Sequence, residues 1–522
     1  MNLAKTYIRV PRFKGKTDIQ LTLDNDFNVP DTKPDIDRLI QEKGDIHITE
    51  LKPMKDKLLI RGELSFGVLY MGEGNMGPLY AMESGLPFEE LVNMDGMEES
   101  DTVRVLWDME DLRTGVINSR KINVRSIVVL HVTATRMEEI EAAVAMENKD
   151  QLWCQNQALT VSPAAAGKKD QLRIREEAAL PGNRPNMMEI LWHQENMENM
   201  EVRLSDGAAL IRGDLTIFML YADETLENPV NDVELTIPVD GTIPISEASQ
   251  EMIPDIQIHM DHINLEIRSD KDGEARVVGI EAVLAADMMI YKEEHMELLK
   301  DIYSPKITLT PQIRPVTFEN IILKNQSKAS IREKVKLKEN GGKMLQICHA
   351  RGSVKLDSAE MTDQGIQVEG VVYLRLLYIS DDDRRPVNAS KAALPFAYTI
   401  ETGATKSPCS FEVYPSIEQM NVTMSSGNEL DVKAVISLDA MIFEEVAANI
   451  VSDVQEDALD FEKIENMPGM IGHIVKEGDT IWKLAKCYYA SPEDIRAVNG
   501  LESDELTPGM PLLIMKNMEI LS

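Results

Sequence analysis

Hydrophobic and polar residues alternate over one long stretch of the chain, and this stretch occurs three times. The copies read LLIRGELSFGVLYMGE from Leu58, ALIRGDLTIFMLYADE from Ala209 and IQVEGVVYLRLLYISD from Ile366. The alternating apolar positions of the first copy are Leu64, Phe66, Val68 and Tyr70. A period of two with one apolar face is typical of a β-strand that is buried on one side. The face between these positions is mixed, so we expect it to be only partly buried.

Other residues recur at the same two spacings, 151 and then 157 residues. The anchors are Gly62, Gly213 and Gly370; Tyr70, Tyr221 and Tyr378; Pro87, Pro238 and Pro395. Pro34 and Pro185 are again 151 residues apart, and IREEAAL at Ile174 precedes IREKVKL at Ile331 by 157. This pattern predicts three copies of one domain. The period is too long for a solenoid unit and suits a row of whole domains, like beads.

Each copy is predicted to be mainly β, as a two-layer sandwich. Further alternating runs follow the repeated strand, and turn signals such as Asp272-Gly273 separate them. We expect one short helix after Pro34 and one after Pro185, while the third copy has GGKMLQI from Gly341 in place of the proline. The glycine before each repeated strand is interpreted as a bulge or turn position.

The predicted domain boundaries follow from these repeats. The three β-rich repeats are expected at 1–150, 168–303 and 304–452. NQALTVSPAAAGKKDQ, from Asn156, is interpreted as a linker between the first two repeats. Residues 453–470 are acidic and contain Pro468-Gly469, so they are interpreted as a tether to a small domain at 471–516.

The last 50 residues predict a compact β-α-α-β unit. HIVK from His473 is a short strand, and Asp479 or Thr480 can cap a first helix whose apolar stripe is Ile481, Leu484, Ala485 and Tyr488. Ser491 and Pro492 start a second helix, which Asn499-Gly500 ends. Ile495 and Val498 are expected to form its buried face. We expect Cys487 to pack against this second helix.

This tail resembles the LysM domain from end to end. The run Gly-Asp-Thr-Ile-Trp from Gly478, the later Asn-Gly-Leu and the Pro-Gly before the last strand all have the spacing of that family. The resemblance implies a shallow groove for N-acetylglucosamine chains of peptidoglycan or chitin. Its walls and rim would be Gly478, Asp479, Thr480, Ile481, Asn499, Gly500, Leu501, Pro508 and Gly509. These residue types are also the ones that the turns and helix caps of the fold require.

Composition narrows the possible partners. The net charge of −34 disfavours binding to nucleic acid and to anionic membranes, and 43% hydrophobic residues are enough for packed cores. No run of 18 uncharged apolar residues is present, so we expect no membrane insertion. The opening MNLAKTYIRVPRFKGK lacks the apolar stretch of an export signal, and the four cysteines are scattered. We therefore expect a cytoplasmic protein.

Candidate chemistry is sparse. His259 and His262 lie three residues apart in an alternating run, so we expect them on opposite faces of a strand and not at a shared metal ion. No nucleophile elbow, zinc-binding HExxH or phosphate loop occurs. We expect no catalytic residues, no cofactor and no metal, and hence no enzyme.

Three β-rich repeats followed by one LysM domain resemble the clostridial spore-coat morphogenetic scaffold proteins. Their tandem β domain, of unknown function, is best matched by IREEAALPGNRPNMMEILW from Ile174. The resemblance implies a non-enzymatic scaffold in the mother-cell cytoplasm around the forespore. It also implies that the LysM region binds the ATPase of the coat basement layer, or other coat proteins. Two alternatives stay open: a peptidoglycan-binding protein of cell wall or spore cortex, and a hydrolase with its catalytic centre in the β repeats.

Overall fold

The first repeat folds into six antiparallel strands in two facing sheets. The computed structural model describes residues 3–73, 79–146, 152–223, 231–304, 306–337, 342–382, 384–403, 409–426, 429–458, 464 and 466–516. One sheet has the order β1-β6-β5 and the other β2-β3-β4. The strands are β1 (Leu3–Asn28), β2 (Ile36–Met54), β3 (Lys57–Gly72), β4 (Leu79–Asn93), β5 (Thr102–Asn118) and β6 (Lys121–Met146).

The second and third repeats have the same two sheets. In the second, the orders are β12-β13-β8 and β11-β10-β9; in the third they are β15-β20-β19 and β16-β17-β18. The second repeat contains β8 (Ala164–Ala179), β9 (Met187–Ser205), β10 (Ala208–Asp223), β11 (Asn231–Pro244), β12 (Ile253–Ser269) and β13 (Ala275–Tyr291). The third contains β15 (Thr308–Lys336), β16 (Met344–Thr362), β17 (Gly365–Ser380), β18 (Val387–Ile400), β19 (Cys409–Ser426) and β20 (Glu429–Asp457).

The alternating face of the repeated strand forms each sandwich core, as the sequence predicts. Leu64, Val68 and Tyr70 have no exposed surface, and their counterparts in β10 and β17 are buried as well. Full burial of a side chain of this size contributes about 1.5–3 kcal/mol. The mainly β fold of three tandem repeats is therefore confirmed.

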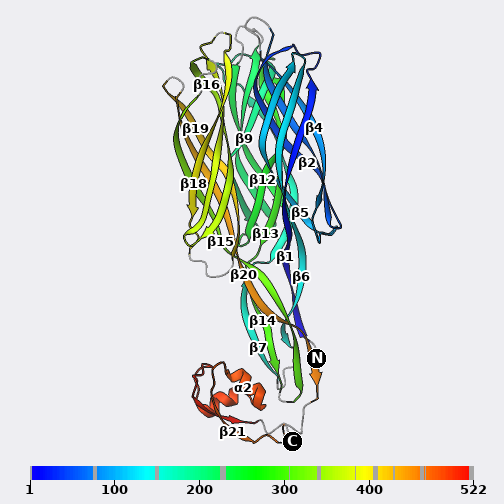
Figure 1. The fold of residues 1–522 in the computed structure, drawn as a ribbon, viewed down its shortest axis with the longest axis vertical. Coiled ribbons are helices and arrows are strands. Elements are labelled where there is room, and N and C mark those ends of the chain that lie inside the picture. Colours follow the sequence, from blue (N-terminus) through cyan, green and yellow to red (C-terminus); the bar gives the residue numbers. More distant parts are fainter. Residues whose placement is uncertain are drawn as a thin grey trace.

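The three sandwiches lie side by side around a common axis, and not as separate beads (Figure 1). Leu69, Leu220 and Leu377, on the face that we expected to be only partly buried, meet there in one buried cluster with Trp192 and Phe218. A period of two marks only the face that each sandwich buries by itself. The packing between repeats buries the other face of the same strand.

A narrow stalk extends from the sandwiches (Figure 1). Three antiparallel pairs of strands form it. In two of them the N-terminal half of one long strand pairs with the C-terminal half of another: β1 with β6, and β15 with β20. The third pair consists of β7 (Trp153–Val161) and β14 (Glu294–Tyr303). Side chains of all three ribbons share one core, which includes Ile8, Leu159 and Phe318. The expected linker from Asn156 is thus wrong, because this segment is a paired strand of the stalk.

The prediction of a short helix after Pro34 and after Pro185 is also wrong. Strands β2 and β9 start two residues after these prolines. Each proline carbonyl accepts a hydrogen bond from the repeat's own tyrosine, with Tyr70 Oη 3.1 Å from the Pro34 oxygen and Tyr221 Oη 3.2 Å from the Pro185 oxygen. The proline therefore anchors the strand entry to the core. Gly341, in the third copy, lies outside the described residues.

The repeated glycines lie opposite β-bulges of the neighbouring strand. Register shifts occur in β2 beside Ile48, in β9 opposite Gly213 and in β16 beside Leu356. A Cβ on Gly62 would lie 2.6 Å from the carbonyl oxygen of His47, and one on Gly370 would lie 2.3 Å from that of Lys355. Close backbone approach at a bulge therefore requires glycine.

The C-terminal domain lies at the foot of the stalk (Figure 1). It consists of β21 (Met470–Ile474), α2 (Ile481–Tyr488), α3 (Pro492–Asn499) and β22 (Pro511–Met515), with the two strands paired antiparallel. The expected β-α-α-β unit is confirmed. Strand β20 continues to Asp457, so the first residues of the expected acidic tether, 453–457, belong to the stalk. Residues 459–463 and 465 of that tether lie outside the described residues.

Candidate functional site

The two helices of the C-terminal domain are capped as their sequences predict. Thr480 Oγ1 accepts a hydrogen bond from the Lys483 N–H at 3.2 Å, and Ser491 Oγ accepts one from the Asp494 N–H at 3.2 Å. Gly500 ends α3 in the left-handed conformation, with φ 61°. These caps fix both loops that border the expected groove.

The first groove wall is held by its own polar groups. The Asp479 carboxylate accepts a hydrogen bond from the Lys476 N–H at 2.8 Å and lies 2.8 Å from His473 Nε2. These contacts lower the pKa of Asp479, chiefly through the hydrogen bond with His473. Gly478, with φ 84°, is exposed. Ile481 is buried in the domain core, so it supports the wall from behind.

The second wall is built around the amide of Asn499. Its nitrogen donates to the Ile495 and Leu513 carbonyls at 2.8 and 2.7 Å, and its oxygen accepts from the Leu513 N–H at 2.7 Å. This side chain therefore joins α3 to β22. Leu501 packs against the same core cluster as Ile481, so the two walls converge on shared apolar side chains.

The rim at Pro508 and Gly509 lies beside the end of β21. The Gly509 N–H donates to the Val475 carbonyl at 2.8 Å, and the Val475 N–H donates to the Met510 carbonyl at 2.9 Å. Gly500, Pro508 and Gly509 are exposed. The polar side chains of the expected groove thus form hydrogen bonds within the domain. The groove surface is left mainly with backbone groups. Whether these residues contact a ligand stays a prediction.

Two expectations about the helices are wrong. Val498 is 42% exposed, because α3 turns this position toward solvent while Ile495 fills the core. Cys487 is exposed on α2 and does not fill the space toward α3.

The outer face of the β21–β22 sheet is apolar and exposed. Its side chains alternate with Leu512 and Ile514, which are buried in the domain core. These exposed side chains form a surface that we call the sheet patch. It consists of Met470 (58% exposed), Ile474 (57%), Leu513 (36%) and Met515 (43%). An exposed apolar surface of this kind is typical of a protein-binding site.

The opposite side of the domain is docked on the stalk through Asp301 of β14. The Asp301 carboxylate accepts a hydrogen bond from the Trp482 indole N–H at 2.7 Å and forms an ion pair with Lys486 Nζ at 2.8 Å. Trp482 and Lys486 are four residues apart, so one face of α2 carries both. Sequence reasoning missed this interface. The available signal was that both residues lie off the apolar stripe of α2, which packs into the domain core.

A second stalk residue, Trp153 of β7, contacts α3. Its indole N–H donates to Glu493 Oε2 at 2.7 Å. The indole stacks on the ring of Tyr303, with ring centroids 5.5 Å apart, and burial raises the pKa of that tyrosine. The tryptophan was hidden from sequence reasoning because it precedes a segment that we interpreted as a linker. Both contacts together set the direction in which the sheet patch faces.

The paired histidines lie on one face of their strand, contrary to expectation. His259 is opposite Ala285 and His262 is opposite Val283, because a bulge at Asp261 separates them. Both side chains are exposed. Even so, the described residues contain no group of three or more His, Cys, Asp or Glu side chains that could hold a metal ion.

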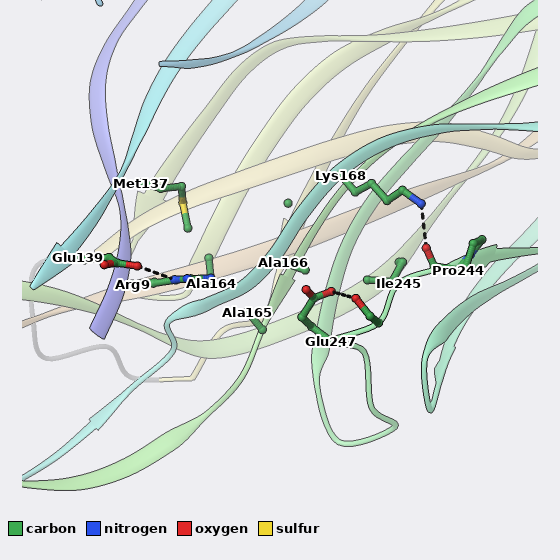
Figure 2. Close-up of a pocket in the computed structure, with 12 residues that line it drawn as sticks. Arg9, Met137, Glu139, Ala164, Ala165, Ala166, Lys168, Pro244, Ile245 and Glu247 are labelled. Atoms are coloured by element: carbon green, nitrogen blue, oxygen red, sulfur yellow. Dashed lines mark hydrogen bonds and ion pairs between the residues drawn. The ribbon is translucent and has the colours of Figure 1, made fainter. Parts of the chain in front are cut away.

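A pocket of about 560 Å³ lies where the stalk meets the second sandwich (Figure 2). Small residues of β8 line it, and its charged groups already have partners. Arg9 Nε lies 3.0 Å from a Glu139 oxygen, and Lys168 Nζ donates to the Pro244 carbonyl at 2.9 Å. With these partners in place, the pocket offers few free groups for a ligand.

Comparison with known families identifies both parts of the chain. The SipL, SPOCS domain matches residues 35–117, 186–268 and 343–425, and the LysM domain matches residues 473–514. The three SPOCS matches begin 151 and then 157 residues apart, which is the repeat spacing found in the sequence. Each covers the second to fifth strands of a sandwich, so the long strands that build the stalk lie outside the match.

No curated protein and no solved structure matches the chain. No helix in the described part is long and apolar enough to cross a membrane. The matched domains are binding domains without catalytic function. With three SPOCS domains and a C-terminal LysM domain, the chain belongs to the clostridial spore-coat scaffold family.

Proposed function

We propose that the protein is a non-enzymatic adaptor of endospore coat assembly that binds a coat-basement protein through its LysM domain. The domain content fits a sporulation-related scaffold that carries a LysM domain. The proposed partner is the ATPase of the coat basement layer, and the proposed place is the mother-cell cytoplasm at the forespore surface. Both are taken from the family resemblance.

The sheet patch is the observation that supports a protein partner. Its four apolar side chains remain exposed although the opposite side of the LysM domain is docked on the stalk. Burying such side chains against a partner is favourable by about 25 cal/mol for each Å² removed from water. A sugar chain has polar hydroxyl groups along its length and would gain less from this surface.

The state of the groove supports the same choice. The Asp479 carboxylate, the Thr480 hydroxyl and the Asn499 amide all have partners within the domain. Sites for small polar ligands usually present a few free, well-placed polar groups. Here such groups would have to come mainly from the backbone of the exposed Gly478, Gly500 and Gly509.

The competing function is binding of peptidoglycan, which the LysM match itself favours. Both groove loops are exposed, so a glycan chain could reach them. In that case the groove and not the sheet patch would determine binding. The two functions can therefore be separated with variants of the full chain.

The test is co-sedimentation of the full chain with polymers of the purified coat-basement ATPase and, in parallel, with purified sacculi. We expect Leu513→Glu to abolish binding to the ATPase, since it places a charge in the sheet patch. Leu345→Glu is the matched control, because Leu345 is also an exposed leucine (56%) but lies in the third repeat. Saturable binding to sacculi that Thr480→Ala weakens, with no binding to the ATPase, would overturn the proposal.

A further inference from the structure

A second pocket, of about 550 Å³, lies where the third sandwich meets the first. It is lined by residues 40–42 of β2, 335–337 at the end of β15, Arg375 and Tyr378 of β17, and residues 389–392 of β18. A volume of this size is typical of a site for a small organic molecule. None of the functions discussed above uses it.

The third repeat has small residues in this pocket at positions where other repeats have larger ones. At the fixed repeat spacings, Ser390 aligns with Met82 and Val233, which are both buried core residues. Ala392 aligns with Leu235, which is buried in the second sandwich, and with the small Ser84 in the first. The strand pairings of the three repeats follow the same alignment. The space that these side chains fill elsewhere is therefore left open here.

A tyrosine that is bonded to a proline carbonyl in the first two repeats has no such bond within the described part of the third. Tyr70 and Tyr221 donate to the carbonyls of Pro34 and Pro185. The third repeat lacks this proline, and the Tyr378 hydroxyl has no hydrogen-bond partner within the part of the chain that the structure describes. Among the described residues, the pocket thus contains a hydrogen-bond donor that is not in use.

The pocket also gathers positive charge in a strongly acidic chain. Arg375 and Lys391 are directly opposite each other on β17 and β18, and Lys336 lies at the end of β15. Like charges at opposed positions destabilise a sheet. The repeat fold does not require these cations, because the other two repeats have different residues there. Arg375 aligns with Gly67 and Phe218, Lys391 with Glu83 and Glu234, and Lys336 with Asn28 and Ala179.

One carboxylate balances only part of this charge. Glu42 forms an ion pair with Lys391, and its backbone carbonyl accepts a hydrogen bond from Arg375 Nη1 at 3.2 Å. Arg375 has no carboxylate within ion-pair distance among the described residues, and burial lowers the pKa of its guanidinium. The nearest negative charge, Glu42, is thus already paired with Lys391, and a half-buried cation without an ion pair of its own would be stabilised by an anion in this pocket.

We propose that this pocket binds a small organic anion that carries a phosphate or carboxylate group. The Arg375 guanidinium holds the anionic group, Lys336 and Lys391 add charge at the rim, and the Tyr378 hydroxyl donates a hydrogen bond. The apolar part of the ligand packs against Val335 and the small residues of β18. The pocket is remote from the LysM domain, so this binding is independent of the function proposed above.

The test is isothermal titration calorimetry of the full chain at low ionic strength, with pyrophosphate and with succinate as probes. We expect saturable binding of at least one probe. Arg375→Gln should weaken it at least about tenfold, since it removes a charge-assisted hydrogen bond. Ser390→Met should also weaken it, because it restores the side chain that fills this space in the first repeat. Arg332→Gln is the control, as this exposed arginine pairs with Asp431 outside the pocket.

The two probes distinguish the sources of the anionic group. Binding of pyrophosphate alone supports a phosphorylated ligand, and binding of succinate alone supports a carboxylic acid. If Arg375→Gln does not fold, Lys336→Gln replaces it, because Lys336 is exposed and its loss leaves the core intact. The proposal is overturned if neither probe binds, or if Arg332→Gln weakens binding as much as the pocket variants do.

Discussion

Asp301→Ala should release the LysM domain from the stalk. The Asp301 carboxylate is bonded to two groups of α2, the Trp482 indole at 2.7 Å and the Lys486 ammonium at 2.8 Å. A hydrogen bond to a charged group contributes about 1.5–3 kcal/mol, and a partly exposed ion pair about 0.2–1 kcal/mol. Losing both lowers the free energy of docking by about 2–3 kcal/mol, which reduces the ratio of docked to released domain roughly 30- to 150-fold.

The assay is the NMR linewidth of LysM amides in the full chain. A docked domain tumbles with the whole 58.6 kDa molecule and gives broad signals, whereas a released domain tumbles almost independently and gives sharp ones. Glu297→Ala is the matched control, because Glu297 is an acidic residue of the same strand whose side chain bonds Asn156 and not the LysM domain. If linewidths stay the same in Asp301→Ala and in the control, the stalk contact does not hold the domain.

Three further substitutions test the fold and its electrostatics. Ser491→Ala removes the cap of α3 and should lower the stability of the LysM domain by about 1 kcal/mol, seen as a lower Tm of that transition; an unchanged Tm would contradict the capping role. Gly370→Ala places a Cβ 2.3 Å from the Lys355 carbonyl oxygen, so the free energy of unfolding from urea titration should fall by about 1–3 kcal/mol. Gly115→Ala is the control, because the space around Gly115 is open, and it should cause no such fall. Burial raises the pKa of Asp45 to about 6. The folded state therefore binds this proton more tightly than the unfolded state, and stability is lost as pH rises from about 4 to 6. Asp45→Asn should stabilise the protein at pH 7 and leave it unchanged near pH 4 in urea unfolding; a gain of equal size at both pH values would refute this assignment.

The sequence predicts the repeat unit and the LysM domain well because both depend on local patterns. The alternation that ends at Tyr70 identifies a strand. The cap at Ser491 locates the start of α3 to the residue, and the choice of Asp479 or Thr480 locates the start of α2 to within one residue. The same reasoning fails after Pro34, where KPDIDRLI has an apolar spacing compatible with a helix turn. Tertiary pairing with β3 makes this segment a strand.

Contacts between repeats were not predictable from one repeat's pattern. Leu69 and its counterparts resemble members of a mixed face until three copies meet at the axis. The linker-like segment after Trp153 becomes a strand only because β14 pairs with it. The bulge at Asp261, which turns His259 and His262 to one face, likewise has no signal in a strict alternation.

The candidate site was predicted as a set of residues, but their roles depend on hydrogen bonds that a sequence does not show. Asn499 could have faced a ligand, and in the structure its amide bonds the backbone of β22. The sheet patch was overlooked because the alternation of PLLIM is short and both of its faces are apolar.

Site-specific photo-crosslinking in sporulating cells tests the central claim most directly. A photoreactive amino acid would replace Leu513 in the sheet patch, Thr480 in the groove, or Leu345 in the third repeat. The proposed function predicts a crosslink from position 513 to the coat-basement ATPase and none from position 345. Crosslinks from position 480 to peptidoglycan, with none from position 513 to any coat protein, would contradict it.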